Sequence, residues 1–120
     1  MKVFVLRYEY AHHGENFTRG VHMTHKGALL DQSVILLEIL MDMDWDEEDT
    51  REIYYIGDII EKGDPITVDE LIQHINVLER LADNAEVYTE IEAFTLQPYR
   101  RQHDLYHHTY RNSLYRHLFI

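Results

Sequence analysis

The segment from His25 to Met43 constrains the fold more than any other part of this chain, because it is almost entirely apolar. Thr24 precedes it as an N-cap, which predicts a helix over residues 25–43. The polar interruptions are few: Asp31, Gln32, Ser33, Glu38 and Asp42. A helix with so narrow a polar stripe has to be buried on more than one side. One hairpin cannot cover it, so we expect the C-terminal segment or a second subunit, as in a homodimer, to complete the cover.

Three segments have the pattern of β-strands. Residues 3–10 are rich in β-branched and aromatic side chains, four of which share one face at period two: Phe4, Leu6, Tyr8 and Tyr10. Turn-forming residues at 12–16 allow residues 17–23 to return as an antiparallel partner. Residues 86–97 alternate apolar and polar side chains and predict a third strand.

Further helices are predicted on both sides of that third strand. Thr67 and Glu70 form a capping box for a helix over residues 68–82, whose buried face is predicted at Ile72, Ile75, Leu78 and Leu81. Thr50 can cap a short helix that reaches Ile60, although residues 52–56 also fit a strand. After Pro98, four residues at helical spacing predict an amphipathic helix over about 101–118: Tyr106, Tyr110, Leu114 and Leu118.

These elements predict a single α+β domain over residues 1–120, a small antiparallel sheet with helices on one face. The basic aromatic helix within residues 99–120 is expected to pack on this domain or on a partner. With 45% hydrophobic residues, the chain can form a core. It has no cysteine, which excludes disulfides, thiolate catalysis and Cys-type metal sites. No apolar run reaches the roughly 20 residues of a spanning helix, and the charged start does not fit a signal peptide. We therefore expect a soluble cytoplasmic protein that does not bind membranes.

Charge is distributed unevenly along the chain, whose net charge is -11. Residues 25–97 contain four basic and 19 acidic side chains, whereas residues 98–120 contain four basic and one acidic. A field of this sign repels nucleic acid from the body of the protein and attracts basic partners. Nucleic-acid binding is therefore not expected of the body and stays open only for the C-terminal tail.

The densest acidic run surrounds the only tryptophan, Trp45, and is predicted to be a helix end and a loop. Its carboxylates are Asp42, Asp44, Asp46, Glu47, Glu48 and Asp49. An EF-hand fails, because the glycine and closing glutamate of that loop would fall on Glu47 and Ile53. The run is a solvated loop, a protein-binding surface or a specific metal site. The second interpretation has a physical basis, since a dense row of carboxylates can mimic nucleic-acid phosphates in an Arg/Lys groove.

The tail offers histidines, arginines and tyrosines. His103 with His107, and Asp104 with His108, stand four residues apart, but a zinc site needs three or four ligands, with others from elements such as His12, His13 or His22. We predict no metal site, because two ligands are too few, and no catalytic residues, because no nucleophile accompanies the histidines. No cofactor is predicted either. Four residues of the tail are candidate binding residues: Arg100, Arg101, Tyr106 and Tyr110. They suit a helix that covers the body, a partner or dimer interface, or single-stranded nucleic acid.

Three stretches carry a resemblance to a known group of proteins. "KVFVLRYEYAHHGENF", then "MTHKGALL" and later "VDELIQHINVLERLADNAEVYTEIEAFTL" resemble a pattern in small uncharacterised proteins of tailed bacteriophages. The resemblance covers roughly residues 1–45 and 66–96, and no functional residues come with it. It implies an origin, since small acidic phage proteins often bind and disable a host enzyme or defence complex.

The leading hypothesis is a non-enzymatic phage inhibitor of a host nuclease or defence complex, of the anti-CRISPR or anti-restriction type, acting in the host cytoplasm. It would act as a DNA mimic that covers a basic surface with the carboxylates of residues 42–49 and 58–70, with Trp45 and nearby tyrosines as candidate anchors. The alternatives are a nucleic-acid-binding adaptor that uses the tail and a histidine-based metal-dependent enzyme.

Overall fold

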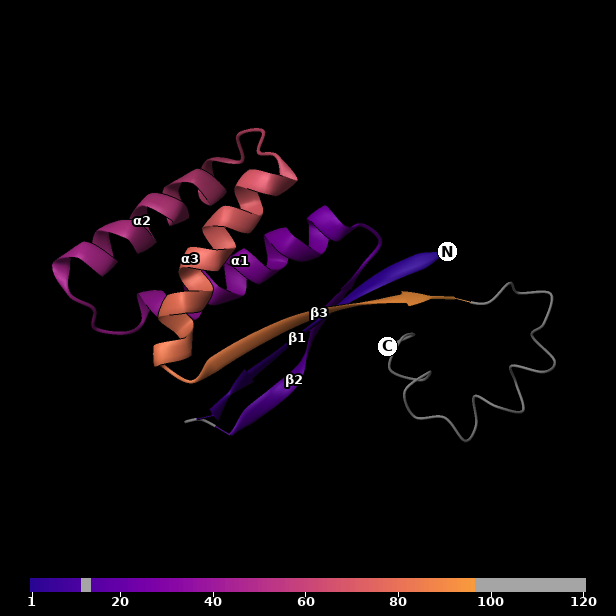
Figure 1. Ribbon diagram of the computed structural model, residues 1–120, viewed down its shortest axis with the longest axis horizontal. Helices are drawn as coiled ribbons and strands as arrows, with labels where there is room; N and C mark the ends of the chain where they lie inside the picture. Colours follow the sequence, from indigo (N-terminus) through magenta and orange to yellow (C-terminus); the bar gives the residue numbers. More distant parts are fainter. Residues whose placement is uncertain (12–13, 97–120) are drawn as a thin grey trace.

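The computed structural model describes residues 1–11 and 14–96, in which helices cover one side of a small antiparallel sheet (Figure 1). The elements in chain order are β1 (Lys2–Tyr10), β2 (Glu15–His22), α1 (His25–Met41), α2 (Glu47–Lys62), α3 (Val68–Asn84) and β3 (Val87–Thr95). The predicted α+β class, with its N-terminal hairpin and third strand, is confirmed. The helix predicted over 101–118 lies outside the described residues.

The sheet has the order β2-β1-β3, so β1 is its central strand. Both pairings are antiparallel, and Leu6 lies opposite Gly20 on one side and Ile91 on the other. Residues paired in this way share a face, which places Leu6, Tyr8 and Ile91 on the inner face, toward the helices. The register of β1 and β2 shifts after Leu6, so Arg19 is an extra residue in β2 and forms a bulge.

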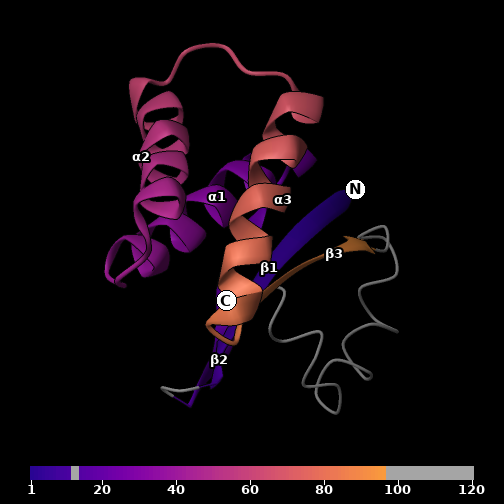
Figure 2. The ribbon, with the colours of Figure 1, turned by 60° about the vertical axis from the view of Figure 1, so that its left-hand side comes forward.

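Helix α1 lies at the centre of the molecule. It contacts all three strands on one side and both α2 and α3 on the other. Leu36 and Leu40 are fully buried in the resulting core. Within the described residues, α2 and α3 therefore cover the side of α1 that faces away from the sheet. Figure 2 shows α2 as the helix farthest from the strands, with α1 and α3 between it and the sheet.

Helix α2 begins earlier than the sequence indicated. The side chain of Asp46, not Thr50, is its N-cap, and the helix ends at Gly63, whose φ of 69° is left-handed. The alternative of a strand over residues 52–56 was wrong. Residues 42–46 form the predicted helix end and loop, whereas Glu47, Glu48 and Asp49 belong to the first turn of α2, where the helix dipole favours acidic side chains.

Helix α3 begins as predicted, since the Thr67 hydroxyl accepts a hydrogen bond from the Glu70 N–H at 3.1 Å. The buried face has Leu71 in place of the predicted Ile72 and also includes Ala82. It consists of Leu71, Ile75, Leu78, Leu81 and Ala82. Ile72 is 36% exposed because it lies next to this stripe on the helix circumference. None of the helices among residues 1–11 and 14–96 combines the length and apolar character needed to cross a lipid bilayer.

One partly buried polar network joins α1, α3 and β3 at the edge of the core. The buried Gln32 amide donates from Nε2 to Glu79 Oε1 at 3.1 Å and to Thr89 Oγ1 at 2.9 Å. Desolvation of the carboxyl group raises the pKa of Glu79 above its ordinary value of 4.5, while the hydrogen bond from Gln32 acts in the opposite direction. The Gln32 amide N–H groups thus have acceptors, and partial burial, not this hydrogen bond, disfavours the ionised form of Glu79.

Alanine substitutions of Leu78 and Ile72 in α3 test which residues form the buried face of this helix. Leu78→Ala removes a side chain with 0% exposure, so it should lower the free energy of unfolding by about 2–5 kcal/mol. Ile72→Ala removes an apolar side chain of similar size at a 36% exposed position of the same helix and should cost clearly less. Urea denaturation followed by circular dichroism measures both, and equal losses would contradict the assignment of Leu78 to the buried face and of Ile72 to its margin.

Glu79 should make stability depend on pH. A carboxyl whose pKa is raised in the folded state holds its proton more tightly there, so it destabilises the fold as pH rises above 4.5. Glu79→Gln keeps an oxygen that accepts from Gln32 but does not ionise. Its stability relative to wild type should therefore increase between pH 4 and pH 7, measured by thermal unfolding. A difference that stays constant over this interval would contradict the raised pKa.

Candidate functional site

The acidic run predicted as a site is divided between structural and exposed positions. Asp42 is the C-cap residue of α1, and Asp46 accepts a hydrogen bond from the Asp49 N–H at 2.7 Å. Glu47, Glu48 and Asp49 form the first turn of α2. Asp44 lies exposed between the two helices. Part of this charge therefore starts a helix, and its exposed carboxylates cluster at the end of α2.

Trp45, predicted as an anchor for a partner, is partly buried. Its indole N–H donates to the Leu40 carbonyl at 2.8 Å, and its ring packs beside the core. It also lines a hollow of about 260 Å³ between the end of α1 and the start of α2, together with Leu40, Met41, Met43, Asp44, Thr50, Ile53 and Tyr54. Trp45 thus forms a wall that a partner side chain can reach.

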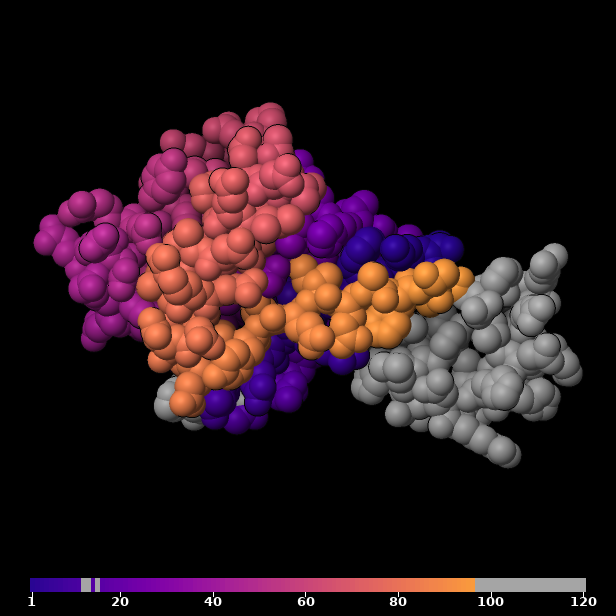
Figure 3. All heavy atoms as spheres, viewed as in Figure 1, coloured from indigo at the N-terminus to yellow at the C-terminus, as the bar shows by residue number. Residues whose placement is uncertain are grey.

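Two tyrosines of α2 lie on the side of the helix that faces away from the core. Tyr54 is 54% exposed and Tyr55 63% exposed, while Ile53 and Ile56 face the core. We call the exposed residues of this helix the α2 outer surface: Glu47, Glu48, Arg51, Tyr54, Tyr55, Asp58, Glu61 and Lys62. Figure 3 shows α2 at the margin of the molecule, on the side away from β3. Both tyrosines are among the nearby tyrosines expected as anchors, and the apolar stripe of Ile53, Ile56 and Ile60 is the signal in the sequence that places them on the outer side of the helix.

Carboxylates flank these tyrosines at both ends of α2. Exposed ones precede the helix at Asp42, Asp44 and Asp46, and others follow it at Asp64, Asp69 and Glu70. Over residues 42–70 the only basic residues are Arg51 and Lys62. Arg51 is partly neutralised by Glu47, at 3.3 Å. The surface is therefore aromatic at its centre and anionic at its ends.

Contacts with α3 hold the helix in place. The Tyr55 ring meets the His74 ring edge-on, with centroids 6.4 Å apart. Arg80 of α3 forms an ion pair with Glu52 at 3.5 Å. Tyr55 is thus positioned before any partner arrives, and less side-chain entropy is lost on binding.

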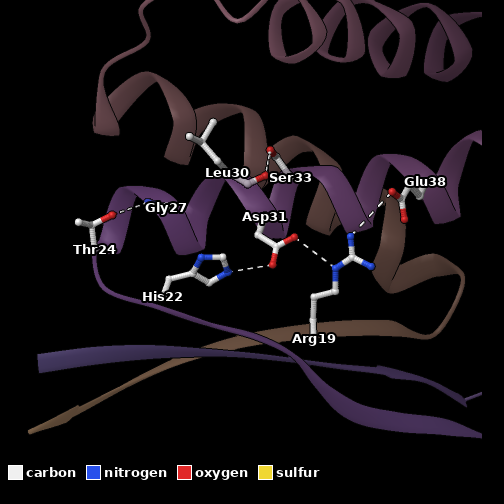
Figure 4. Close-up of polar contacts among 8 residues, drawn as sticks. All are labelled: Arg19, His22, Thr24, Gly27, Leu30, Asp31, Ser33 and Glu38. Atoms are coloured by element: carbon white, nitrogen blue, oxygen red, sulfur yellow. Dashed lines mark hydrogen bonds and ion pairs between the residues drawn. The ribbon is translucent and has the colours of Figure 1, made fainter. Parts of the chain in front are cut away.

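A second polar cluster lies between β2 and α1 (Figure 4). Asp31 contacts His22 Nε2 at 2.9 Å and accepts a hydrogen bond from Arg19 Nε at 3.2 Å, and Arg19 also reaches Glu38 at 3.8 Å. Gly20 permits this approach, since a β-carbon there would lie 3.0 Å from an Asp31 oxygen. The nearby hydroxyls are already engaged, with Ser33 donating to the Leu30 carbonyl and Thr24 capping α1. The cluster fastens β2 to α1.

The structure brings together only part of the predicted site. The carboxylates of residues 42–49 and 58–70 lie at the two ends of α2, whereas Arg100, Arg101, Tyr106 and Tyr110 are outside the described residues. His22, one of three histidines considered as an additional zinc ligand, contacts Asp31. Within residues 1–11 and 14–96, no group of three or more His, Asp or Glu side chains could hold a metal ion.

The two roles of the acidic run can be separated by mutation. Asp46→Ala removes the N-cap of α2 and should lower the free energy of unfolding by about 1 kcal/mol. Asp44→Ala removes the same charge from an exposed position two residues earlier and should change stability by less than about 0.5 kcal/mol. Chemical denaturation measures both. If the two variants were equally destabilised, the capping role of Asp46 would be disproved.

Comparison with known proteins does not add to this picture. No protein-family model, curated protein or solved structure matches the chain.

Proposed function

We propose that this is a non-enzymatic interaction protein that binds a basic surface of another protein through the α2 outer surface. The partner class we propose is a host nuclease or defence complex whose nucleic-acid groove is covered by an acidic phage inhibitor. The observation that carries the proposal is the pair of exposed tyrosines, 54% and 63% accessible, on a helix flanked by carboxylates at both ends.

Aromatic and charged residues have different tasks in such an interface. Tyrosine is among the residue types that dominate binding energy, because it buries a large rigid surface and keeps a polar tip. Carboxylates at the rim contribute mainly to the rate and specificity of encounter with a positive surface. The arrangement on α2, with tyrosines at the centre and acids around them, matches this division.

The hollow beside Trp45 supports a basic partner. Its volume of about 260 Å³ suits a single side chain, and the residues that line it include Trp45, Tyr54 and Asp44. An arginine or lysine can place its aliphatic stem against such walls and its charge near a carboxylate and aromatic faces. The partner would then supply the side chain that enters, and Trp45 would receive it.

The test is inhibition of DNA cleavage by a panel of purified restriction and CRISPR nucleases. Wild-type protein should inhibit at least one of them, and added salt should weaken the inhibition because the encounter is electrostatic. Tyr54→Ala with Tyr55→Ala should weaken inhibition about tenfold or more, since interface tyrosines carry much of the binding energy. Asp58→Asn with Glu61→Gln should slow the onset of inhibition.

Matched controls use residues outside the α2 outer surface. Tyr88→Ala removes another exposed tyrosine, and Asp83→Asn with Glu90→Gln neutralises the same number of exposed carboxylates. These variants should inhibit like wild type. The proposal fails if none of the nucleases is inhibited, or if the α2 variants and their controls behave alike.

A further inference from the structure

The outer face of the sheet, on the side away from the helices, has an apolar half. The register places four apolar side chains together near the start of β1: Val3, Val5, Val21 and Phe94. Val3 and Val5 are buried, yet neither belongs to the hydrophobic clusters that the helices cover. Apolar side chains grouped on a sheet face are stabilised by a second layer. This half of the face therefore needs a cover other than α1, α2 or α3.

The other half of the outer face is acidic and hollowed. A hollow of about 490 Å³ is lined by Arg7, Tyr8, Glu9, Asn16, Tyr88, Thr89 and Glu90. Arg7 is paired with Glu92 at 3.2 Å. Glu9 and Glu90 have no ion-pair partner among residues 1–11 and 14–96. A cover for the whole face should therefore be apolar at one end and carry positive charge.

The chain itself continues from the edge of this face. Leu96 donates its N–H to the Met1 carbonyl at 2.8 Å, so residues 97–120 start beside Val3 and Phe94. These 24 residues contain four arginines and one aspartate. A helix over residues 101–118 would be about 27 Å long at 1.5 Å per residue, and a nine-residue strand such as β1 spans about 30 Å. Position, charge and length all match the outer face.

We infer that residues 99–120 dock on the outer face of the sheet as an amphipathic helix. Its stripe of Tyr106, Tyr110, Leu114 and Leu118 faces the sheet, with Tyr106 over the apolar half, and Arg111 at the margin of that stripe lies toward Glu9 and Glu90. The basic aromatic tail is then an internal layer of the protein and is not a free nucleic-acid-binding arm. This inference does not depend on the proposed function, because α2 lies on the other side of the sheet.

The cysteine-free sequence allows a direct test in the full-length chain. A helix that starts at the edge of the face brings Tyr106 near Val21, so Tyr106→Cys with Val21→Cys should form an intramolecular disulfide on mild oxidation. The control pairs Tyr106→Cys with Ala93→Cys. Ala93 is exposed and adjoins Phe94, but it lies on the inner face opposite Phe4. A tail without a docking site would reach Ala93 at least as readily as Val21.

Disulfide formation is followed by intact mass and by gel mobility without reductant. We expect the Val21 pair to close about tenfold or more faster than the Ala93 pair, because docking raises the effective concentration of the two thiols. Equal rates, or faster closure at Ala93, would overturn the inference. Disulfides formed only between chains would also overturn it and would assign the face to a second copy.

A second cysteine pair keeps the test valid if Val21→Cys impairs folding. Thr18 is exposed, and it lies opposite Arg7 on the outer face. Thr18→Cys with Tyr110→Cys tests the same helix farther along the sheet. Its rate of disulfide formation is compared with that of the Ala93 pair. Circular dichroism of the reduced proteins checks that each variant keeps the wild-type fold. Slow closure in both outer-face pairs, in folded protein, would refute docking.

Discussion

The burial of α1 is the constraint on which the rest of the structure depends. A 17-residue helix with few polar positions has to be surrounded, and the described elements do this from two sides. The sheet covers one side of the helix, and α2 and α3 cover the other. Because apolar burial supplies most of the favourable free energy of folding, the layers are arranged around this helix. The position of α2 as the outermost layer follows from this arrangement.

Much of this fold could be predicted from local sequence. The period-two pattern of β1 and the caps at Thr24 and Thr67 act within a few residues, so they are visible without any tertiary information. Helix α2 was placed too late because Thr50 was taken as its N-cap, whereas the acids before Thr50 already lie at the favourable end of the helix dipole. Ile72 was assigned to the core because neighbouring apolar positions on a helix can be ranked only once the packing partner is known.

The positions of the charged residues in the candidate site were predicted better than its shape. Counting carboxylates located both ends of α2, since charge density is a property of the sequence. The hollow at Trp45 depends on how the end of α1 approaches the start of α2, which no local pattern reports. The same holds for the contact between Asp31 and Arg19, because it requires a register shift in the sheet. Interactions that join distant elements were therefore found only in the structure.

The bulge at Arg19 has a consequence for how the molecule behaves in a crowded solution. β2 is an outside strand of the sheet, and such strands can recruit a strand from another chain and start aggregates. An extra residue interrupts the regular ladder of β2. The Arg19 guanidinium, paired with Asp31 and Glu38, places a charge beside the edge of β2. The contact that fastens β2 to α1 thus also discourages this strand from propagating into fibres.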